Sequence, residues 1–246
     1  YTVEQFEENP NLWQEIVHPE DRDTINAVMK QLQETGTGER ECRIIRGDGE
    51  VRWISDRSHL IYDEHGMPVR IDGIASDITE RRQNEEQIRY QNAFQEMIAH
   101  MAKRFVGATA HNMDTFISDA LDQIGVFFQV DRTSIVRSSA DMTTATTTHE
   151  WHRVPGKYPP SPVREYPMET MPWYAGKILT ERTFVEVPDT AEMPAEARNE
   201  QAILQSLGIK SALTVPVYTE RHVYGFIGVY TIERYEQWSP EHIRGL

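Results

Sequence analysis

Apolar residues recur at helical spacing in several parts of this 246-residue chain, and between these parts they alternate as they do in strands. One apolar stripe consists of Ile25, Val28, Met29 and Leu32. A longer stripe consists of Met113, Phe116, Ile117, Ala120, Leu121, Ile124 and Phe127. Each stripe predicts a helix with one buried face, and Gly36 predicts the end of the first helix.

Residues 77–106 contain no proline and no glycine, which predicts one continuous helix roughly 45 Å long at about 1.5 Å per residue. Asp77 is a short acidic residue that can accept from free N–H groups at the helix start, with Glu80 three positions on. Gly107 predicts the end. A helix of this length is expected to connect two domains.

Before this helix, three runs have strand character: 40–46, 51–62 and 69–76. Asp48-Gly49 predicts a tight hairpin turn between the first two, since both residues tolerate positive φ. This part is therefore expected to be a helix followed by a three-stranded antiparallel meander.

After residue 127, the pattern predicts a second α+β domain. The polar stretch 138–147 is expected to be a loop, and the proline-rich stretch 155–167 is expected to cross the surface. The expected strands are 131–137, 148–154, 184–187, 211–218 and 223–232, and the expected helices are 172–181 and 193–207.

The fold class is thus α+β, with two antiparallel-sheet domains joined by a long helix. We expect a first domain at residues 1–78, a connecting helix at 79–106 and a second domain at 107–246. Ser239 and Pro240 have the pattern of a helix start close to the end of the sequence. That helix is expected to be truncated, and the chain is expected to be a piece of a longer protein.

Charge and cysteine content restrict the partners. The net charge is −14, with 39 acidic and 25 scattered basic residues, which disfavours nucleic acid as a partner. Cys42 is the single cysteine, so no intrachain disulfide is expected. No apolar run approaches the ~20 residues needed to cross a bilayer, and no secretory signal is present. We expect a cytoplasmic protein without membrane contact in this part.

The first 85 residues resemble the C-terminal half of a PAS domain with its PAC motif, through His18-Pro-Glu-Asp21, Trp53 and the exit sequence 73–79. A complete PAS domain has two further strands before these elements. Light-sensing PAS domains that link flavin to cysteine carry an Asn-Cys-Arg motif, whereas this chain has Asn11-Leu-Trp-Gln14, so no cysteine-linked flavin is expected. His18 is interpreted as a turn and capping residue, which disfavours haem.

The second part resembles a GAF domain, of the kind found beside PAS domains in bacterial sensor histidine kinases and diguanylate cyclases. The residues that carry the resemblance are Val130-Asp-Arg132, His149-Glu-Trp151, Met171-Pro-Trp173, Val187-Pro-Asp189, Gly208-Ile-Lys-Ser211, Val215-Pro-Val217, Gly225-Phe-Ile-Gly228 and Trp238. Covalent bilin attachment by a GAF domain requires a cysteine there, and this part has none, so no covalent bilin is expected.

Catalysis and metal binding find little support. On a strand, His149 and Trp151 point to one face and Glu150 and His152 to the other, so the four do not converge on a metal. There is no GxSxG motif and no P-loop. We therefore expect a non-enzymatic module without a metal site, whose output domain, a kinase or a diguanylate cyclase, lies elsewhere in the same protein.

The resemblance to GAF domains implies a cavity between the sheet and the middle helices. Residues that it places near this cavity are Trp151, Trp173, Tyr174, Asp189 and Thr214. The alternative is that these aromatic residues are ordinary core. Two functions follow: a sensor that binds a small molecule, or a ligand-free module for dimerisation and signal relay. Asp77 and Thr79 are expected to be the joint through which movement enters the long helix.

The second half of the long helix has an apolar seam of two heptads, too short to hold a coiled coil alone. The seam consists of Tyr90, Phe94, Met97, Met101 and Phe105. We expect it to pack on the second domain and on a second copy in a parallel homodimer. The alternative is packing on its own domain only.

Overall fold

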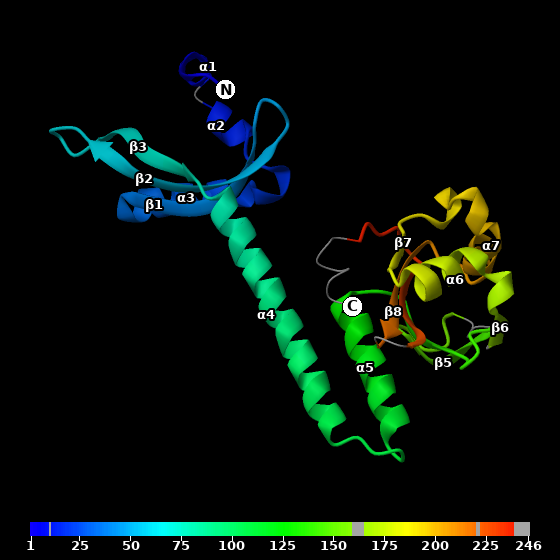
Figure 1. Cartoon of the computed structure of the whole chain (residues 1–246). Coiled ribbons are helices and arrows are strands. Elements are labelled where there is room, and N and C mark those ends of the chain that lie inside the picture. Colours follow the sequence, from blue (N-terminus) through cyan, green and yellow to red (C-terminus); the bar gives the residue numbers. More distant parts are fainter. Residues whose placement is uncertain (10, 159–164, 220–221, 239–246) are drawn as a thin grey trace. The chain divides into compact units, whose positions relative to one another are not determined.

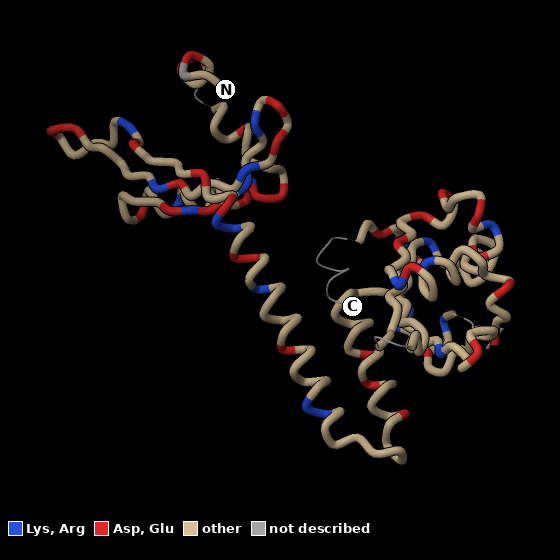
Figure 2. The backbone as a smooth tube through the Cα atoms, viewed as in Figure 1, with Lys and Arg blue, Asp and Glu red and all other residues tan. Residues whose placement is uncertain are grey.

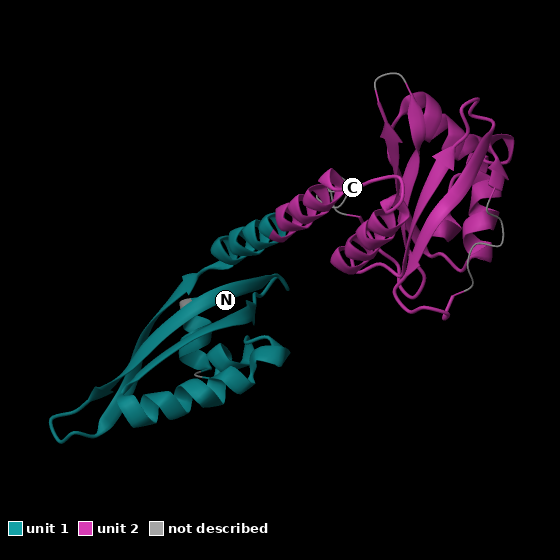
Figure 3. Cartoon of the chain, turned by 90° about the horizontal axis from the view of Figure 1, so that it is seen from below, with its two compact units in different colours: residues 1–92 teal, residues 93–246 magenta. Residues whose placement is uncertain are grey.

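The computed structural model describes residues 1–9, 11–158, 165–219 and 222–238, so Ser239 and Pro240 lie outside the described residues. The chain forms two compact units, Tyr1–Asn92 and Ala93–Leu246, shown in different colours in Figure 3. The helix α4, Thr79–Val106, passes from the first unit into the second (Figure 1). The α+β class and the connecting helix are confirmed.

The N-terminal unit begins with two short helices, α1 (Val3–Glu8) and α2 (Leu12–Glu15), and a 3₁₀ turn, η1 (Pro19–Asp21). The predicted amphipathic helix follows as α3, Asp23–Thr35, and it ends where Gly36 adopts a left-handed conformation with φ 75°. The sheet has the order β1 (Thr37–Ile45), β2 (Val51–Tyr62) and β3 (Pro68–Asp77), all antiparallel. The helix and the meander are therefore confirmed.

A small apolar core joins the helices to the strands of this unit. Val17, Cys42 and Ile54 are buried together, with Trp13, Ile25 and Ile44 packed against them. On β1, Gly38 lies so close to α3 that a Cβ there would be 2.8 Å from a methyl carbon of Val28. A larger residue at 38 would separate α3 from the sheet.

The C-terminal unit starts with the second half of α4 and with α5, Met113–Phe127. Its sheet has the order β6-β5-β4-β9-β8-β7 and is antiparallel at every pairing. The strands are β4 (Arg132–Ser138), β5 (Thr144–His152), β6 (Glu165–Pro167), β7 (Val185–Val187), β8 (Ser211–Tyr218) and β9 (Val223–Thr231).

Helices cover both faces of this sheet (Figure 1). On one face, α5 contributes Ile124 to a buried cluster that includes Leu213 and Val229 of the sheet, and Phe94 and Met101 of α4 pack against it. On the other face lie α6 (Pro172–Ala175), its π-helical continuation η3 (Gly176–Glu181) and α7 (Arg198–Ser206). Both faces of the central strands are therefore core.

Three parts of this unit differ from the sequence expectation. Residues 165–167, at the end of the stretch expected to cross the surface, form β6 and pair with β5. β5 begins at Thr144 rather than at 148, because the threonine-rich residues expected to be a loop pair with β4 and β6. Threonine is β-branched and suits a pleated strand once a neighbour is present. The helix expected from Met193 begins as α7 only at Arg198, because two 3₁₀ turns, η4 (Thr190–Glu192) and η5 (Ala195–Ala197), precede it.

Charged residues of both signs are interspersed along both units (Figure 2). Among the described helices, none is long and apolar enough to cross a membrane. Among the described residues, no group of three or more His, Cys, Asp and Glu side chains is placed to hold a metal ion.

Candidate functional site

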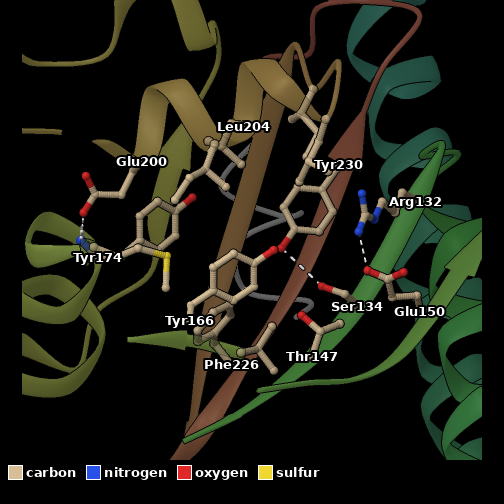
Figure 4. Close-up of a pocket in the computed structure, with 15 residues that line it drawn as sticks. Arg132, Ser134, Thr147, Glu150, Tyr166, Tyr174, Glu200, Leu204, Phe226 and Tyr230 are labelled. Carbon is tan, nitrogen blue, oxygen red and sulfur yellow. Dashed lines mark hydrogen bonds and ion pairs between the residues drawn. The ribbon is translucent and has the colours of Figure 1, made fainter. Parts of the chain in front are cut away.

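A cavity of about 70 Å³ lies between the sheet of the C-terminal unit and the helices α6 and α7 (Figure 4). Alternate residues of β4 point into it, because side chains on a strand share a face every second position. Its lining consists of Arg132, Ser134, Val136, Thr147, Glu150, Tyr166, Met171, Tyr174, Glu200, Ile203, Leu204, Leu207, Ile209, Phe226 and Tyr230. The lining is apolar and aromatic with a few polar groups, as in small-molecule sites.

A buried ion pair forms one side of the cavity. The guanidinium of Arg132, with 4% of its side chain exposed, pairs with the carboxylate of Glu150 on the neighbouring strand β5. His152 Nε2 lies 3.8 Å from the second oxygen of Glu150. Burial and the charge of Arg132 lower the pKa of His152, so this imidazole is neutral near pH 7. The charge of Arg132 is therefore balanced by Glu150.

Two buried tyrosine hydroxyls add polar groups to the lining. The hydroxyl of Tyr230 lies 3.2 Å from that of Ser134, and Thr214 Oγ1 lies 3.5 Å from the hydroxyl of Tyr174. Burial raises the pKa of both tyrosines. Both phenols are therefore neutral, and they can donate or accept a hydrogen bond.

Glu200 enters the cavity from α7 with 1% of its surface exposed. Its Oε1 accepts hydrogen bonds from the backbone N–H of Trp173 at 2.8 Å and of Tyr174 at 3.2 Å, at the start of α6. Its Oε2 has no hydrogen-bond partner among the described residues, and the same holds for Nε of Arg132. Such groups are rare in folded proteins, and a bound molecule is one explanation for them.

The residues named from the sequence divide between the two faces of the sheet. Tyr174 lines the cavity, and Thr214 contacts its hydroxyl. Trp173 packs edge-on against Tyr174, with ring centroids 5.6 Å apart, outside the lining. Asp189 also lies outside, where its carboxylate accepts from the N–H of Ala191 at 2.7 Å and caps a 3₁₀ turn.

Trp151 lies on the opposite face of the sheet. Its indole N–H donates to Asp122 of α5 at 2.6 Å, and its ring lies against Gly125 of the same helix. The resemblance placed Trp151 near the cavity, whereas in the structure it packs against α5 on the other face of the sheet. Strand alternation explains the difference, because Glu150 and Trp151 are neighbours on β5 and Glu150 points into the cavity.

The expected joint residues are anchored to the sheet of the N-terminal unit. Asp77 is the last residue of β3, and its Oδ1 accepts from the N–H of Thr79, the first residue of α4, at 2.8 Å. Hydrogen bonding to Thr79 lowers the pKa of Asp77. The buried hydroxyl of Thr79 accepts from the N–H of Trp53 at 2.9 Å. Arg82, one turn further on, lies over the Trp53 ring at 4.9 Å.

The expected seam of α4 packs partly on its own unit. Phe94 lies 5.8 Å from Phe127, and Phe105 lies 6.2 Å from Phe116, between ring centroids. Met101 packs against the buried cluster that contains Ile124, Leu213 and Val229. Tyr90 and Met97 are half-buried. These seam residues thus pack on α5 of the same chain, and the expected contact with a second copy stays a proposal.

Comparison with protein families gives two matches. The GAF domain model matches residues 112–246, more than half of the chain. The chain belongs to the GAF domain family. A PAS fold model matches residues 1–75, ahead of the GAF domain, so the recognition of PAS followed by GAF from the sequence is confirmed.

Two curated relatives come from methanogenic archaea. The chain is 35% identical over 101 residues to the methyl sulfide methyltransferase-associated sensor of Methanosarcina acetivorans, covering 40% of this chain and 10% of that protein. It is 24% identical over 186 residues to the methanogenesis regulatory histidine kinase FilI of Methanothrix harundinacea, covering 74% of this chain and 20% of that protein. The chain thus spans a fifth or less of the length of these relatives.

Solved structures with the same fold include GAF domains with bound bilins. The phycoerythrobilin-bound GAF domain from a cyanobacterial phytochrome matches with a TM-score of 0.53 and 12% identity, over 63% of this chain and 89% of that chain. The chromophore-binding domain of a Stigmatella aurantiaca bacteriophytochrome matches with a TM-score of 0.52 and 12% identity, over 94% and 78%. At this identity the likeness shows the fold.

Proposed function

We propose that this chain is a non-enzymatic sensory part of a signal-transduction protein, and that its GAF cavity binds a small polar ligand without a covalent bond. The PAS and GAF matches and the relatives named as a sensor and a histidine kinase support a sensory role. The observation that carries ligand binding is the cavity itself, where Glu200 Oε2 and Arg132 Nε are buried without partners in the described part of the chain.

The contacts of β4 support a route from the cavity to the connecting helix. Ser134 points into the cavity, while the adjacent Thr133 points to the other face and donates its hydroxyl to the carbonyl of Leu121 in α5 at 3.1 Å. α5 in turn packs on α4 through Phe127 and Phe94. We propose that occupancy shifts β4 and α5, and that α4 passes this shift to the joint at Asp77 and Thr79.

The proposal extends to cofactors and partners. We propose that no bilin or flavin is linked through cysteine, because the single cysteine, Cys42, is fully buried in the N-terminal unit and burial raises the pKa of its thiol. We propose a cytoplasmic homodimer whose output domain, a kinase or a diguanylate cyclase, lies elsewhere in the same protein.

A ligand-free relay module is the second candidate function. The cavity volume of about 70 Å³ favours it, since pockets for drug-sized ligands measure about 300–1,000 Å³. A tetrapyrrole is far larger than this space. The sensor function therefore requires a ligand of only a few heavy atoms.

The experiment is native mass spectrometry of the purified chain together with a thermal-shift screen of small metabolites. The matched variant is Leu204→Phe, because three added carbons at about 25 Å³ each would fill the cavity. We expect at least one compound to be retained by the wild type or to raise its Tm. The same compound is expected neither to be retained by Leu204→Phe nor to raise the Tm of that variant. If no compound in the screen distinguishes the two proteins, the ligand-free relay is the better function.

A further inference from the structure

The charge balance of the cavity leaves one carboxylate without a counter-ion. Arg132 is paired with Glu150, and His152 is neutral because its pKa is lowered. No ion pair found among the described residues includes Glu200, although it is 1% exposed. A buried charge without a partner is strongly disfavoured, so an added cation would be bound favourably here.

The orientation of this carboxylate is set by the protein. The N–H groups of Trp173 and Tyr174 hold Oε1 at 2.8 and 3.2 Å. These bonds leave Oε2 as an acceptor without a donor among the described residues. A carboxylate held in this way can accept an N–H of a ligand without rearranging.

The neighbouring aromatic rings also favour a cation. Tyr166, Tyr174, Phe226 and Tyr230 line the same cavity, and the Tyr174 and Phe226 ring centroids are 6.4 Å apart (Figure 4). The rings of Tyr174 and Phe226 have negative faces that attract a positive group, and this attraction increases when water is excluded, whereas Arg132 already lies over the ring of Tyr230 at 6.0 Å. A divalent cation such as Mg²⁺ takes about six oxygen ligands, whereas Glu200 offers one carboxylate oxygen without a partner among the described residues.

We infer that the GAF cavity binds a small protonated amine, an alkylammonium ion of two to four heavy atoms, with an N–H donating to Glu200 Oε2. This inference rests on the proposed function, because it names the class of ligand for the same cavity. At about 25 Å³ per heavy atom, the cavity volume of about 70 Å³ accommodates a ligand of about three heavy atoms. For about three heavy atoms the affinity ceiling corresponds to a Kd on the order of 1 mM.

The experiment titrates the full chain with methylammonium, dimethylammonium and trimethylammonium chlorides at constant ionic strength set with NaCl. Binding is followed by ligand-observed NMR and by thermal unfolding, with an expected rise in Tm of roughly 3–6 °C at ten times the Kd. Tetramethylammonium, which has no N–H, is expected to bind at least tenfold more weakly, and sodium acetate and 2-propanol are expected to have no effect.

Glu200→Gln is the decisive variant. The amide oxygen of glutamine can still accept from the two backbone N–H groups, while its NH₂ group replaces Oε2, the acceptor for the ligand, and removes the negative charge. It is expected to weaken methylammonium binding at least tenfold. Glu196→Gln is the matched control, since it makes the same charge change on an exposed residue close to α7, and it is expected to bind as the wild type does.

The outcomes separate this inference from the function on which it rests. Equal amine binding by wild type and Glu200→Gln, or equal effects of acetate or 2-propanol, would overturn the amine class. A compound from the wider screen that binds wild type and Glu200→Gln but not Leu204→Phe would also overturn the class and would support the sensor. The absence of any bound compound in the wild type would refute both.

Discussion

Alanine at position 125 tests the placement of Trp151 against α5. A Cβ built on Gly125 would lie 2.1, 2.4 and 2.6 Å from three carbons of the Trp151 ring. Such distances are far inside van der Waals contact, so the ring would have to move. The ring is also held by the indole N–H bond to Asp122 at 2.6 Å, which a displaced ring would lose or weaken. We therefore expect Gly125→Ala to destabilise the C-terminal unit.

The expected magnitude follows from three terms. Overpacking costs about 1–3 kcal/mol, and the loss of a hydrogen bond adds about 0.5–1.5 kcal/mol. Alanine in a helix interior is better than glycine by up to about 1 kcal/mol, which offsets part of this cost. The net loss in the free energy of unfolding is expected to be about 0.5–4.5 kcal/mol.

The assay is urea denaturation followed by far-UV circular dichroism, with the transitions of the two units fitted separately. Gly176→Ala is the control, because Gly176 has helical dihedral angles and a Cβ there would meet nothing within 4 Å. That variant is expected to be neutral or up to about 1 kcal/mol more stable. In a Trp151→Ala background, Gly125→Ala should lose most of its cost. If Gly125→Ala is as stable as Gly176→Ala, the placement of Trp151 is refuted.

Three further predictions concern the N-terminal unit and α4. Thr79→Val removes the side-chain acceptor of the part-buried Trp53 N–H at 2.9 Å and is expected to cost about 0.5–1.5 kcal/mol in urea denaturation, whereas Thr79→Ser should cost less. Hydrogen bonding to Arg43 lowers the pKa of Asp21, so its contribution to stability is present above the unfolded-state value of 3.8 and lost as the pH falls through the lower folded-state pKa. The difference in urea midpoint between wild type and Asp21→Asn should therefore shrink from pH 7 to pH 3, and a constant difference would contradict this reasoning. Ile98 on α4 is 41% exposed, and Ile98→Glu is expected to dissociate the proposed homodimer in sedimentation and to make Tm independent of protein concentration; an unchanged dimer would exclude this face of α4.

Most elements of the fold were predictable because their signals are local. Gly36 ends α3 with a positive φ, and Gly49 takes φ 87° in the predicted hairpin turn. The start of β5 was missed because Thr144 to Thr147 become a strand only through pairing with β4 and β6. Local composition favoured a loop there, and tertiary pairing determined the outcome.

The candidate site was less predictable because both faces of the central sheet are covered by helices. Alternation indicated that His149 and Trp151 share a face, and the structure has both side chains on the α5 side, where they contact Asp114 and Asp122. Alternation cannot tell which covered face holds a cavity, since both faces need apolar side chains. Trp151, a large aromatic residue, was therefore predicted to lie near the cavity, whereas its smaller polar neighbour, Glu150, lines it.

Glu200 did leave a signal in the sequence. The buried residues of α7 are Glu200 and Leu204, four positions apart on one face of the helix, and the half-buried Leu207 follows at the C-cap, so Glu200 lies on the apolar stripe. A carboxylate on the buried stripe of a helix contradicts the hydrophobic pattern and costs stability unless a partner compensates it. The start of α6 supplies partners for one oxygen only. The remaining oxygen has no donor among the described residues, and the proposed ammonium ligand would supply one. For the proposed sensor, this unpartnered acceptor, rather than the number of aromatic residues, is the feature that favours a binding cavity over a packed core.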